Sequence, residues 1–416
     1  MTLTNDEIQI NQFPDLSDPR SFVAGLPFEA FAGMRELAGM YWQPTMLATA
    51  NGGFWAVTRW ADIVAVEKDP ETFTSTQGSA YPATTLPADH PGRDGLMTTD
   101  PPRHSYLRRA AAKGFSPRVV AHFEDWVRSV VSEELDRVEA MEHFDYVTEI
   151  AQTIPARVVL RALGAREEDQ EMLVRLVIAF FAALQDTEGL EQGEGVSEKA
   201  IPVMMEIQAY AAKIQEIKKQ CPADDMFTEL NACVDRGELT QPEYLNWMQT
   251  MLGAGFETTH TTISQSMRMY LDDPEVAERT DRALEEGLGA RVADEYVRVV
   301  SPVIQMARTA TRDVEFGGEQ VRKDDVMVLY YPAANRDPTV FSDPDRFDPW
   351  RPETETLAFG SGVHRCIGAN LAKLEIRVLW EEIHRRGIKL KLNGEPKRGW
   401  SVFINQLTSL PVTRAQ

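Results

Sequence analysis

The chain has 416 residues, of which 43% are hydrophobic and 26% are charged, and its net charge at pH 7 is −21. This composition is that of an ordinary globular protein, long enough to enclose a sizeable buried cofactor. The excess of negative charge argues against nucleic acid as a partner. No stretch rich in proline, glycine or serine divides the sequence convincingly, so we expect one domain over residues 1–416, with an irregular lead over residues 1–20.

Cysteine usage and the N-terminus indicate the compartment. The three cysteines are an odd number and none lies in a C-x-x-C pair, which favours a reducing environment. The N-terminus has neither the cationic start nor the apolar centre of a signal peptide. The most apolar run, residues 173–184, contains Arg175 and is too short to cross a bilayer. We therefore expect a soluble, cytoplasmic protein that does not span a membrane.

The first third of the chain combines short elements with one long loop. We expect a helix near residues 28–38 and a strand over residues 54–60, where aromatic and β-branched residues alternate. Residues 76–91 show no periodicity and predict a loop of a length typical of lids over binding sites. Asp100 and two prolines then open a helix on which His104 and Arg108 share a face. That face is either a solvated basic stripe or a site for an anionic group.

Residues 122–220 predict helix almost throughout, with breaks at Pro155 and Gly164 and at the polar, glycine-rich residues 186–198, which predict a mobile loop. Phe180 precedes this loop. Its side chain is either an ordinary core aromatic or part of the lining of an apolar substrate cavity.

The next segment predicts one unusually long helix of about thirty residues. Thr240 and Glu243 form a capping-box pattern at its start. In its middle lies the sequence AGFETT, where Ala254 and Gly255 allow a group to lie against the helix backbone, and Thr258 can donate to a carbonyl one turn back. His260 is two residues beyond Thr258, so we expect it to face elsewhere and assign it no role.

Two features follow the long helix. Glu295 and Arg298 are three residues apart and can pair on one helical face, an arrangement that by itself is usually a surface ion pair. Residues 314–331 alternate around two glycines and predict a hairpin. The C-terminal residues 400–412 look extended, with a turn at residues 405–407.

Cys366 stands where a glycine-rich loop meets a helix. Gly360, Ser361 and Gly362 precede it, and apolar residues at helical spacing follow it. A thiol beside a helix N-terminus is biased toward the thiolate, which is the form that binds metal. The alternative, a small buried hydrophobic residue, is the common role of a lone cysteine, but it explains neither the paired glycines nor His364.

Together, these residues resemble the haem-ligand signature of the cytochrome P-450 family of haem-thiolate monooxygenases, which this chain carries as Phe359, Gly362, His364, Cys366, Gly368 and Ala372. The resemblance implies a mainly α fold with small β-sheets, with haem b lying between the long helix and the cysteine helix. It makes the Cys366 sulfur the proximal ligand of the iron, beside a loop in which Gly360 and Gly368 lie close to the haem. It assigns the contacts with the haem propionates to His104, Arg108, Arg308 and His364.

The resemblance also implies roles for the long helix and for the scaffold. Glu257 and Thr258 match the acid and alcohol that supply protons during oxygen activation. Glu295, Arg298 and Arg351 match a buried network that holds the cysteine loop in place.

The activity that the resemblance implies is hydroxylation of an apolar small molecule, such as a terpenoid, a steroid or a lipid, with O2 as cosubstrate. Two electrons would come from a separate ferredoxin of the [2Fe–2S] type or from a flavodoxin, each with its own reductase, because the sequence shows no flavin or NAD(P)H region. We expect this partner to dock near the cysteine, against Arg109, Lys113, Arg365 and Lys373.

Two alternatives stay open, a peroxide-driven peroxygenase, which would not need Glu257 and Thr258, and a haem-based ligand-binding or sensor protein. The expected substrate pocket is apolar. Its predicted lining residues are Leu86, Phe180, Met251, Ala254, Val303, Ile304 and Leu407.

Overall fold

The computed structural model describes residues 13–37, 39–47, 49–86, 93, 95–112, 115–184, 200–222 and 226–415. The chain forms two compact units, neither of which is a continuous segment. The sheet unit comprises Met1–Ser105, Glu295–Cys366 and Trp400–Asn405, and the helical unit comprises Tyr106–Asp294, Ile367–Gly399 and Gln406–Gln416. The expected single domain over residues 1–416 stays a prediction.

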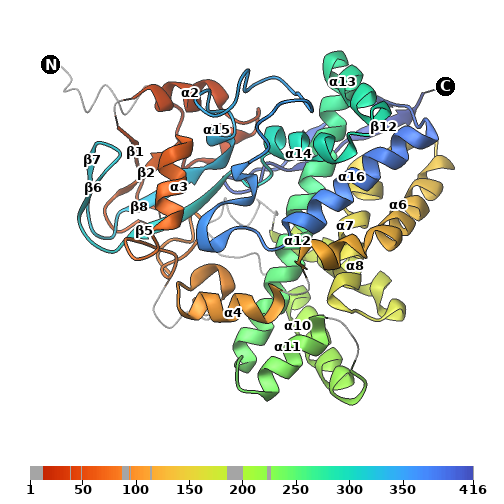
Figure 1. Ribbon diagram of the computed structural model, residues 1–416, viewed down its shortest axis with the longest axis horizontal. Helices are drawn as coiled ribbons and strands as arrows, with labels where there is room; N and C mark the ends of the chain where they lie inside the picture. The colour runs from red at the N-terminus through yellow and green to blue at the C-terminus, as the bar shows by residue number, and fades with distance from the viewer. Residues whose placement is uncertain are drawn as a thin grey trace. The chain divides into compact units, whose positions relative to one another are not determined.

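The sheet unit is built on a five-stranded sheet in the order β1-β2-β8-β5-β3 (Figure 1). Its strands are β1 Tyr41–Pro44, β2 Gly53–Val57, β8 Val326–Tyr330, β5 Gln305–Ala310 and β3 Phe73–Thr74. Strands β2 and β8 pair in parallel and the other neighbours are antiparallel. Because side chains alternate along a strand, β8 contributes Val328 to one core cluster and Met327 to another, and all five of its residues are buried.

Two helices contribute to these clusters. Helix α2 Phe28–Glu36 contributes Phe31 and Met34 to the cluster that contains Val328, and α3 Trp60–Lys68 contributes Ile63 and Val66 to the other. The helix predicted near residue 28 is therefore confirmed. The strand predicted over residues 54–60 ends earlier, at Val57, because Trp60 already begins α3.

The remaining elements of the sheet unit are short. The predicted hairpin is confirmed as β6 Val314–Phe316 and β7 Glu319–Val321, joined through two glycines with positive φ. Further short helical turns occur at η1 Pro19–Phe22, η3 Leu96–Thr98, α15 Tyr331–Ala334, η6 Leu357–Phe359 and η7 Gly362–His364. The turn η1 begins inside the lead that was expected to be irregular, of which residues 1–12 lie outside the described chain.

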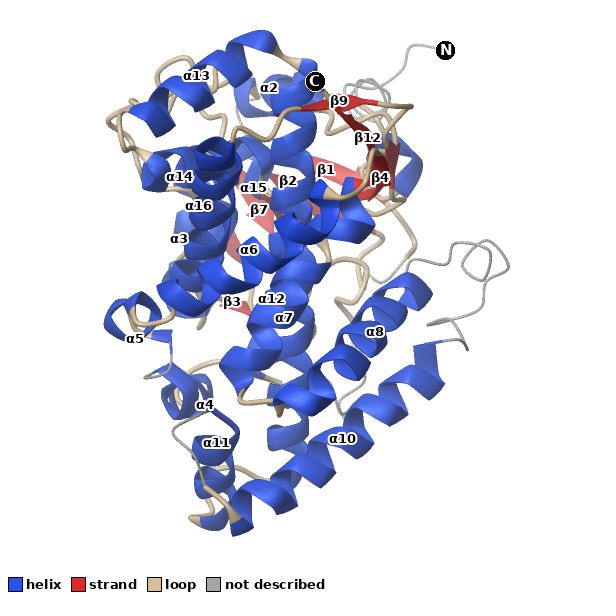
Figure 2. Ribbon diagram, turned by 90° about the vertical axis from the view of Figure 1, so that its right-hand side faces the viewer, coloured by secondary structure: helices blue, strands red, loops and turns tan. Residues whose placement is uncertain are grey.

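The helical unit is organised around α12 Gln241–Asp272, which confirms the predicted long helix and its capping box. This helix packs against α7 Thr153–Leu163, α16 Ala369–Arg386 and α8 Glu167–Leu184 (Figure 2). The other helices of the unit are α5 Pro117–Ala121, α6 Glu124–Glu139, α10 Ala200–Gln220, α11 Met226–Asp235 and α13 Pro274–Glu285. Two helices, α4 Arg103–Ala112 and α14 Gly289–Val300, contain a boundary between the units.

The helical prediction for residues 122–220 is confirmed for most of the described residues, with two differences. Gly164 ends α7 in a left-handed conformation, as expected, but Pro155 does not break the helix. Pro155 lies in the first turn of α7, where its missing N–H is not needed by the helix. A short strand, β4 His143–Asp145, and a π-helical turn, Val147–Ala151, instead separate α6 from α7. The predicted loop at residues 186–198 lies outside the described chain.

Two small sheets complete the helical unit. Strand β12 Pro411–Arg414 pairs with β4 and with β9 Leu390–Leu392, and β10 Lys397–Arg398 pairs with β11 Leu407–Ser409. The predicted fold class, mainly α with small sheets, is confirmed. None of the helices in the described part of the chain combines the length and the apolar character that crossing a bilayer requires.

Candidate active site

Cys366 lies in the connection between η7 and α16, and its side chain is exposed. Its N–H donates to the Phe359 carbonyl at 2.8 Å, which closes the loop around Gly360 and Gly362. These two glycines have φ of 62° and 60°, a region that other residues rarely adopt. The helix predicted beside the cysteine is confirmed, with Gly368 as its N-cap residue. Gly368 has an ordinary φ of −84°, so its backbone does not require glycine.

Three of the four cations predicted to bind propionates belong to the sheet unit. His104 and Arg308 are buried, and the rings of His104 and His364 lie 4.2 Å apart between centroids. The His364 Nε2 is 3.2 Å from the Ser75 Oγ. Burial lowers the pKa of His364, an effect that Asp100, 3.9 Å away, opposes. The fourth predicted cation, Arg108, is half-buried on α4.

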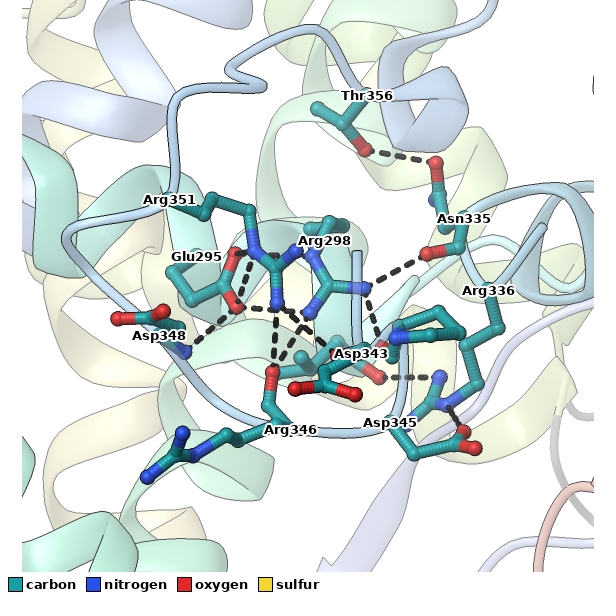
Figure 3. A network of polar contacts seen from close by, with 12 residues as sticks. Glu295, Arg298, Asn335, Arg336, Asp343, Asp345, Arg346, Asp348, Arg351 and Thr356 are labelled. Atoms are coloured by element: carbon teal, nitrogen blue, oxygen red, sulfur yellow. Dashed lines mark hydrogen bonds and ion pairs between the residues drawn. The ribbon is translucent and has the colours of Figure 1, made fainter. Parts of the chain in front are cut away.

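Glu295, Arg298 and Arg351 form a buried ion network in the sheet unit (Figure 3). The Glu295 Oε1 is 2.7 Å from the Arg298 Nη2 and 3.0 Å from the Arg351 Nε, and it also accepts the Asp348 N–H at 2.8 Å. The two guanidinium groups donate to backbone carbonyls of residues 335–346. The buried charges are therefore paired and hydrogen-bonded, which offsets the cost of removing them from water.

A hydrogen-bonded path leads from this network to the cysteine loop. Arg298 donates to the Asn335 carbonyl at 2.7 Å. The Asn335 side-chain oxygen in turn accepts the Leu357 N–H at 2.8 Å and the Thr356 hydroxyl at 3.0 Å, as Figure 3 shows in part. Leu357 begins η6, whose last residue, Phe359, accepts the Cys366 N–H. Asn335 was not singled out in the sequence, because its partners are more than twenty residues away along the chain.

On α12, the hydroxyl of Thr258 donates to the Ala254 carbonyl at 2.8 Å. Ala254 is exposed and Thr258 is half-exposed, whereas residues 259–267 are all buried. The expectation for Gly255 is wrong, because a Cβ built on it would lie 2.8 Å from a methyl group of Val159 on α7. Gly255 therefore permits close packing of two helices, and the open face of α12 belongs to Ala254 and Thr258.

His260 is buried whereas Thr258 is half-exposed, so His260 faces away from Thr258, as expected. Its Nδ1 lies 3.8 Å from the Glu257 Oε2, and both side chains are buried. Burial raises the pKa of Glu257 to about 8 and lowers the pKa of His260 to about 4. Both groups are therefore uncharged at neutral pH. The spacing of three residues between Glu257 and His260, rather than the spacing of two from Thr258, is the signal that places them on one face.

The predicted pocket residues fall into both units. Phe180 lines an apolar cavity of about 20 Å³ inside the helical unit, together with Met248, Leu252 and residues of α10. Met251 and Ala254 are not among its lining residues. Of the remaining predicted residues, Leu407, Val303 and Ile304 are buried and Leu86 is half-buried.

The cations predicted to dock the redox partner differ in exposure and in ion pairing. Arg109 and Arg365 are exposed, whereas the Lys373 Nζ lies 2.7 Å from a carboxylate oxygen of Asp294. Lys113 lies outside the described residues.

Two observations fit a flat, anionic ring with a bound iron. The sheet unit presents an exposed cysteine on a glycine loop, with buried side chains at His104 and Arg308 and a half-buried side chain at His364. In the helical unit, Ala254 on α12 is exposed and Gly253, Gly255 and Thr258 beside it are half-exposed. A thiolate ligand with donors for carboxylates nearby, as the sheet unit provides, suits haem in a thiolate protein.

The comparisons with known proteins identify the family. The family model for cytochrome P450 matches residues 72–386. The chain is 30% identical to a steroid C26-monooxygenase of Rhodococcus jostii, over 96% of this chain and 84% of the relative. It is 29% identical to a linalool 8-monooxygenase of Pseudomonas putida, over 96% and 98%. A crystal structure of a Mycobacterium marinum cytochrome P450 in complex with pseudoionone superposes with a TM-score of 0.85, at 28% identity over 97% of this chain and 98% of that chain.

The chain therefore belongs to the cytochrome P450 family and is a P450 monooxygenase. Membership in this family implies haem with a cysteine thiolate, O2 as cosubstrate, apolar substrates and electrons from a separate redox partner.

Proposed function

We propose that this cytochrome P450 hydroxylates an apolar small molecule of the terpenoid, steroid or lipid type, with Cys366 as the thiolate ligand of haem b. The observation that carries the proposal is the exposed Cys366 thiol at the end of a loop whose backbone has positive φ at Gly360 and Gly362, a conformation that favours glycine. The relatives named for steroid C26 and linalool oxidation support the substrate class.

The haem, when bound, supplies the chemistry that activates O2. The residues of the chain adjust the electronic properties of the haem and supply protons. His104, Arg108, Arg308 and His364 would hold the propionates, the arginines through charge and the histidines through hydrogen bonds. Glu257 holds its proton at neutral pH, because burial raises its pKa to about 8. Since Thr258 donates to the Ala254 carbonyl, its oxygen is left to accept a hydrogen bond from a donor beside α12. A proton relay needs an acid that holds a proton and a hydroxyl group that can accept a hydrogen bond.

Two measurements test the proposal. The reduced protein with carbon monoxide should give the thiolate-type spectrum, and Cys366→Ala should abolish it; a normal thiolate spectrum in that variant would overturn the ligand assignment. The ferric protein should then be titrated with a panel of terpenes, steroids, fatty acids and aromatic hydrocarbons. Displacement of the iron-bound water by at least one of the first three classes is expected, and a response to aromatic hydrocarbons alone would contradict the substrate class.

We also propose that a separate ferredoxin or flavodoxin delivers the electrons and docks near the cysteine, against exposed cations among which we expect Arg365 and Arg109. An acidic partner would be attracted to these cations, because opposite charges accelerate encounter. Arg365→Glu should lower the rate of electron transfer at low salt. The same reversal at the exposed Arg20, in the N-terminal turn η1, serves as the matched control. Equal rates in the Arg365 variant and in the native protein would refute the docking proposal.

A further inference from the structure

Glu67, in the last turn of α3, is a buried carboxylate that accepts three hydrogen bonds. Its Oε1 accepts the Tyr331 hydroxyl at 2.6 Å. Its Oε2 accepts both the N–H and the hydroxyl of Ser361 at 2.7 Å. The Arg308 Nη2 lies 3.8 Å from Oε1. All four groups belong to the sheet unit.

Every printed polar partner of the carboxylate is a hydrogen-bond donor or a guanidinium. A backbone N–H can only donate, and burial together with the charge of Glu67 raises the pKa of Tyr331 well above its usual value, so the phenol keeps its proton. A carboxylate that accepts three hydrogen bonds beside a buried guanidinium has the partners that a buried charge needs. The polar groups of the Glu67 side chain are therefore satisfied inside the protein.

The backbone of the cysteine loop is also pressed against the end of α3. A Cβ built on Gly362 would lie 2.2 Å from the Glu67 carbonyl oxygen, and one built on Gly360 would lie 3.2 Å from the Glu67 Oε1. Both glycines have positive φ as well. The loop that carries Cys366 is thus seated on Glu67 through backbone and side chain together.

We propose that Glu67 is a positioning residue that joins two parts of the predicted haem site. Its Oε2 holds the loop of Cys366 through Ser361, and its Oε1 orients the guanidinium of Arg308, which we assign to a propionate. One carboxylate therefore couples the placement of the thiolate to the placement of a propionate cation. This inference rests on the proposed function of Cys366 and Arg308.

The main test substitutes the carboxylate without changing its shape. In Glu67→Gln the amide oxygen can still accept from Ser361, but the charge that faces Arg308 is lost. We expect the fraction of reduced protein with the thiolate-type carbon monoxide spectrum to fall several-fold, and the reduction potential of the haem iron to rise because a negative charge has been removed. Glu67→Asp restores the charge, so the potential should return toward the native value even where the loop stays loosened.

The matched control is Glu71→Gln, which removes an exposed charge just beyond α3 and should leave both readouts at the native values. Ser361→Ala is a milder variant, which removes one of the three hydrogen bonds and should lower the thiolate fraction less than Glu67→Gln does. It keeps the test decisive if Glu67→Gln does not accumulate as folded protein.

The outcomes separate the two levels of the argument. If the native protein lacks a thiolate spectrum, the assignment of Cys366 is wrong. If the native spectrum is normal, and if Ser361→Ala and, where it accumulates as folded protein, Glu67→Gln keep the native thiolate fraction and potential, the assignment of Cys366 stands and the role of Glu67 is refuted.

Discussion

Two pairs of buried glutamates, one pair in each unit, have opposite surroundings. In the sheet unit, Glu295 and Glu67 lie beside arginines and accept hydrogen bonds from several donors. In the helical unit, burial raises the pKa of Glu257 to about 8 and that of Glu375, on α16, well above its usual value. We call the first pair struts, because each joins several donors from distant parts of the chain; in the second pair, burial disfavours loss of the proton. Ionised carboxylates hold a loop in place, whereas protonated ones can deliver a proton.

The largest loss of stability is expected where the ion pair of a strut, here Glu295 with Arg298, is removed. Arg298→Ala leaves Glu295 with one arginine fewer and leaves the carbonyls of Asn335 and Pro344 without that donor. Breaking a buried pair typically costs about 3–5 kcal/mol. Urea unfolding should show a loss of this size, accompanied by a lower haem content.

The exposed pair of Arg175 with Glu171 provides the comparison for this prediction. Arg175→Ala should change the free energy of unfolding by no more than about 0.5 kcal/mol, because water screens exposed ion pairs. Equal losses in the two arginine variants would remove the distinction between struts and surface pairs.

A protonated acid should show its role in the pH dependence of turnover. Glu257→Gln cannot release a proton, and loss of a general acid typically lowers a rate by about 10²-fold. The native enzyme should lose the coupling of electron use to hydroxylation as the pH rises through about 8, where Glu257 ionises. The variant should release more of its reduced oxygen as hydrogen peroxide, at a level that does not change across this range. A variant that keeps the native pH profile would exclude Glu257 as the proton donor.

Glu375 tests the same contrast through stability. Its folded pKa is raised by burial, and its Oε2 has no hydrogen-bond partner in the described structure. Above the pKa of the unfolded chain, unfolding releases this proton, so this residue makes the protein less stable as the pH rises toward the folded pKa. Glu375→Gln removes that pH dependence and should stabilise the protein by about 1–2 kcal/mol at pH 8, and by less at pH 5.

The control for this prediction is Glu395→Gln, at an exposed position, which should shift the thermal midpoint equally at both pH values. If Glu375→Gln destabilises the protein at pH 8, the carboxyl group makes contacts that an amide cannot replace.

Residues with local signals were predictable, and residues with distant partners were not. The capping box of Thr240 and Glu243 and the cysteine loop follow from neighbours in the sequence, and the structure has both. Glu67 precedes a lysine near the end of an amphipathic helix and so resembles a surface residue. Its partner Ser361 is 294 positions away, so no local pattern indicates the contact. The one local signal for burial of Glu67 is its spacing of four residues from buried Ile63, which places both side chains on one face of α3.

His260 provides the smallest and most specific test of the uncharged pair. Its ring stacks with Phe256 and lies 3.8 Å from the Glu257 carboxyl group, and it is uncharged above about pH 4. A neutral imidazole still solvates a neighbouring carboxylate better than hydrocarbon does, so His260→Leu should raise the pKa of Glu257 further. We expect the pH above which electron use is no longer coupled to hydroxylation to shift by less than about one pH unit. The carboxyl signal of ¹³C-labelled glutamate, followed by NMR in the native, His260→Leu and His260→Gln proteins, measures this pKa without turnover. The glutamine variant retains a polar group and should fall between the other two; a downward shift in His260→Leu would mean that the imidazole destabilises the carboxylate.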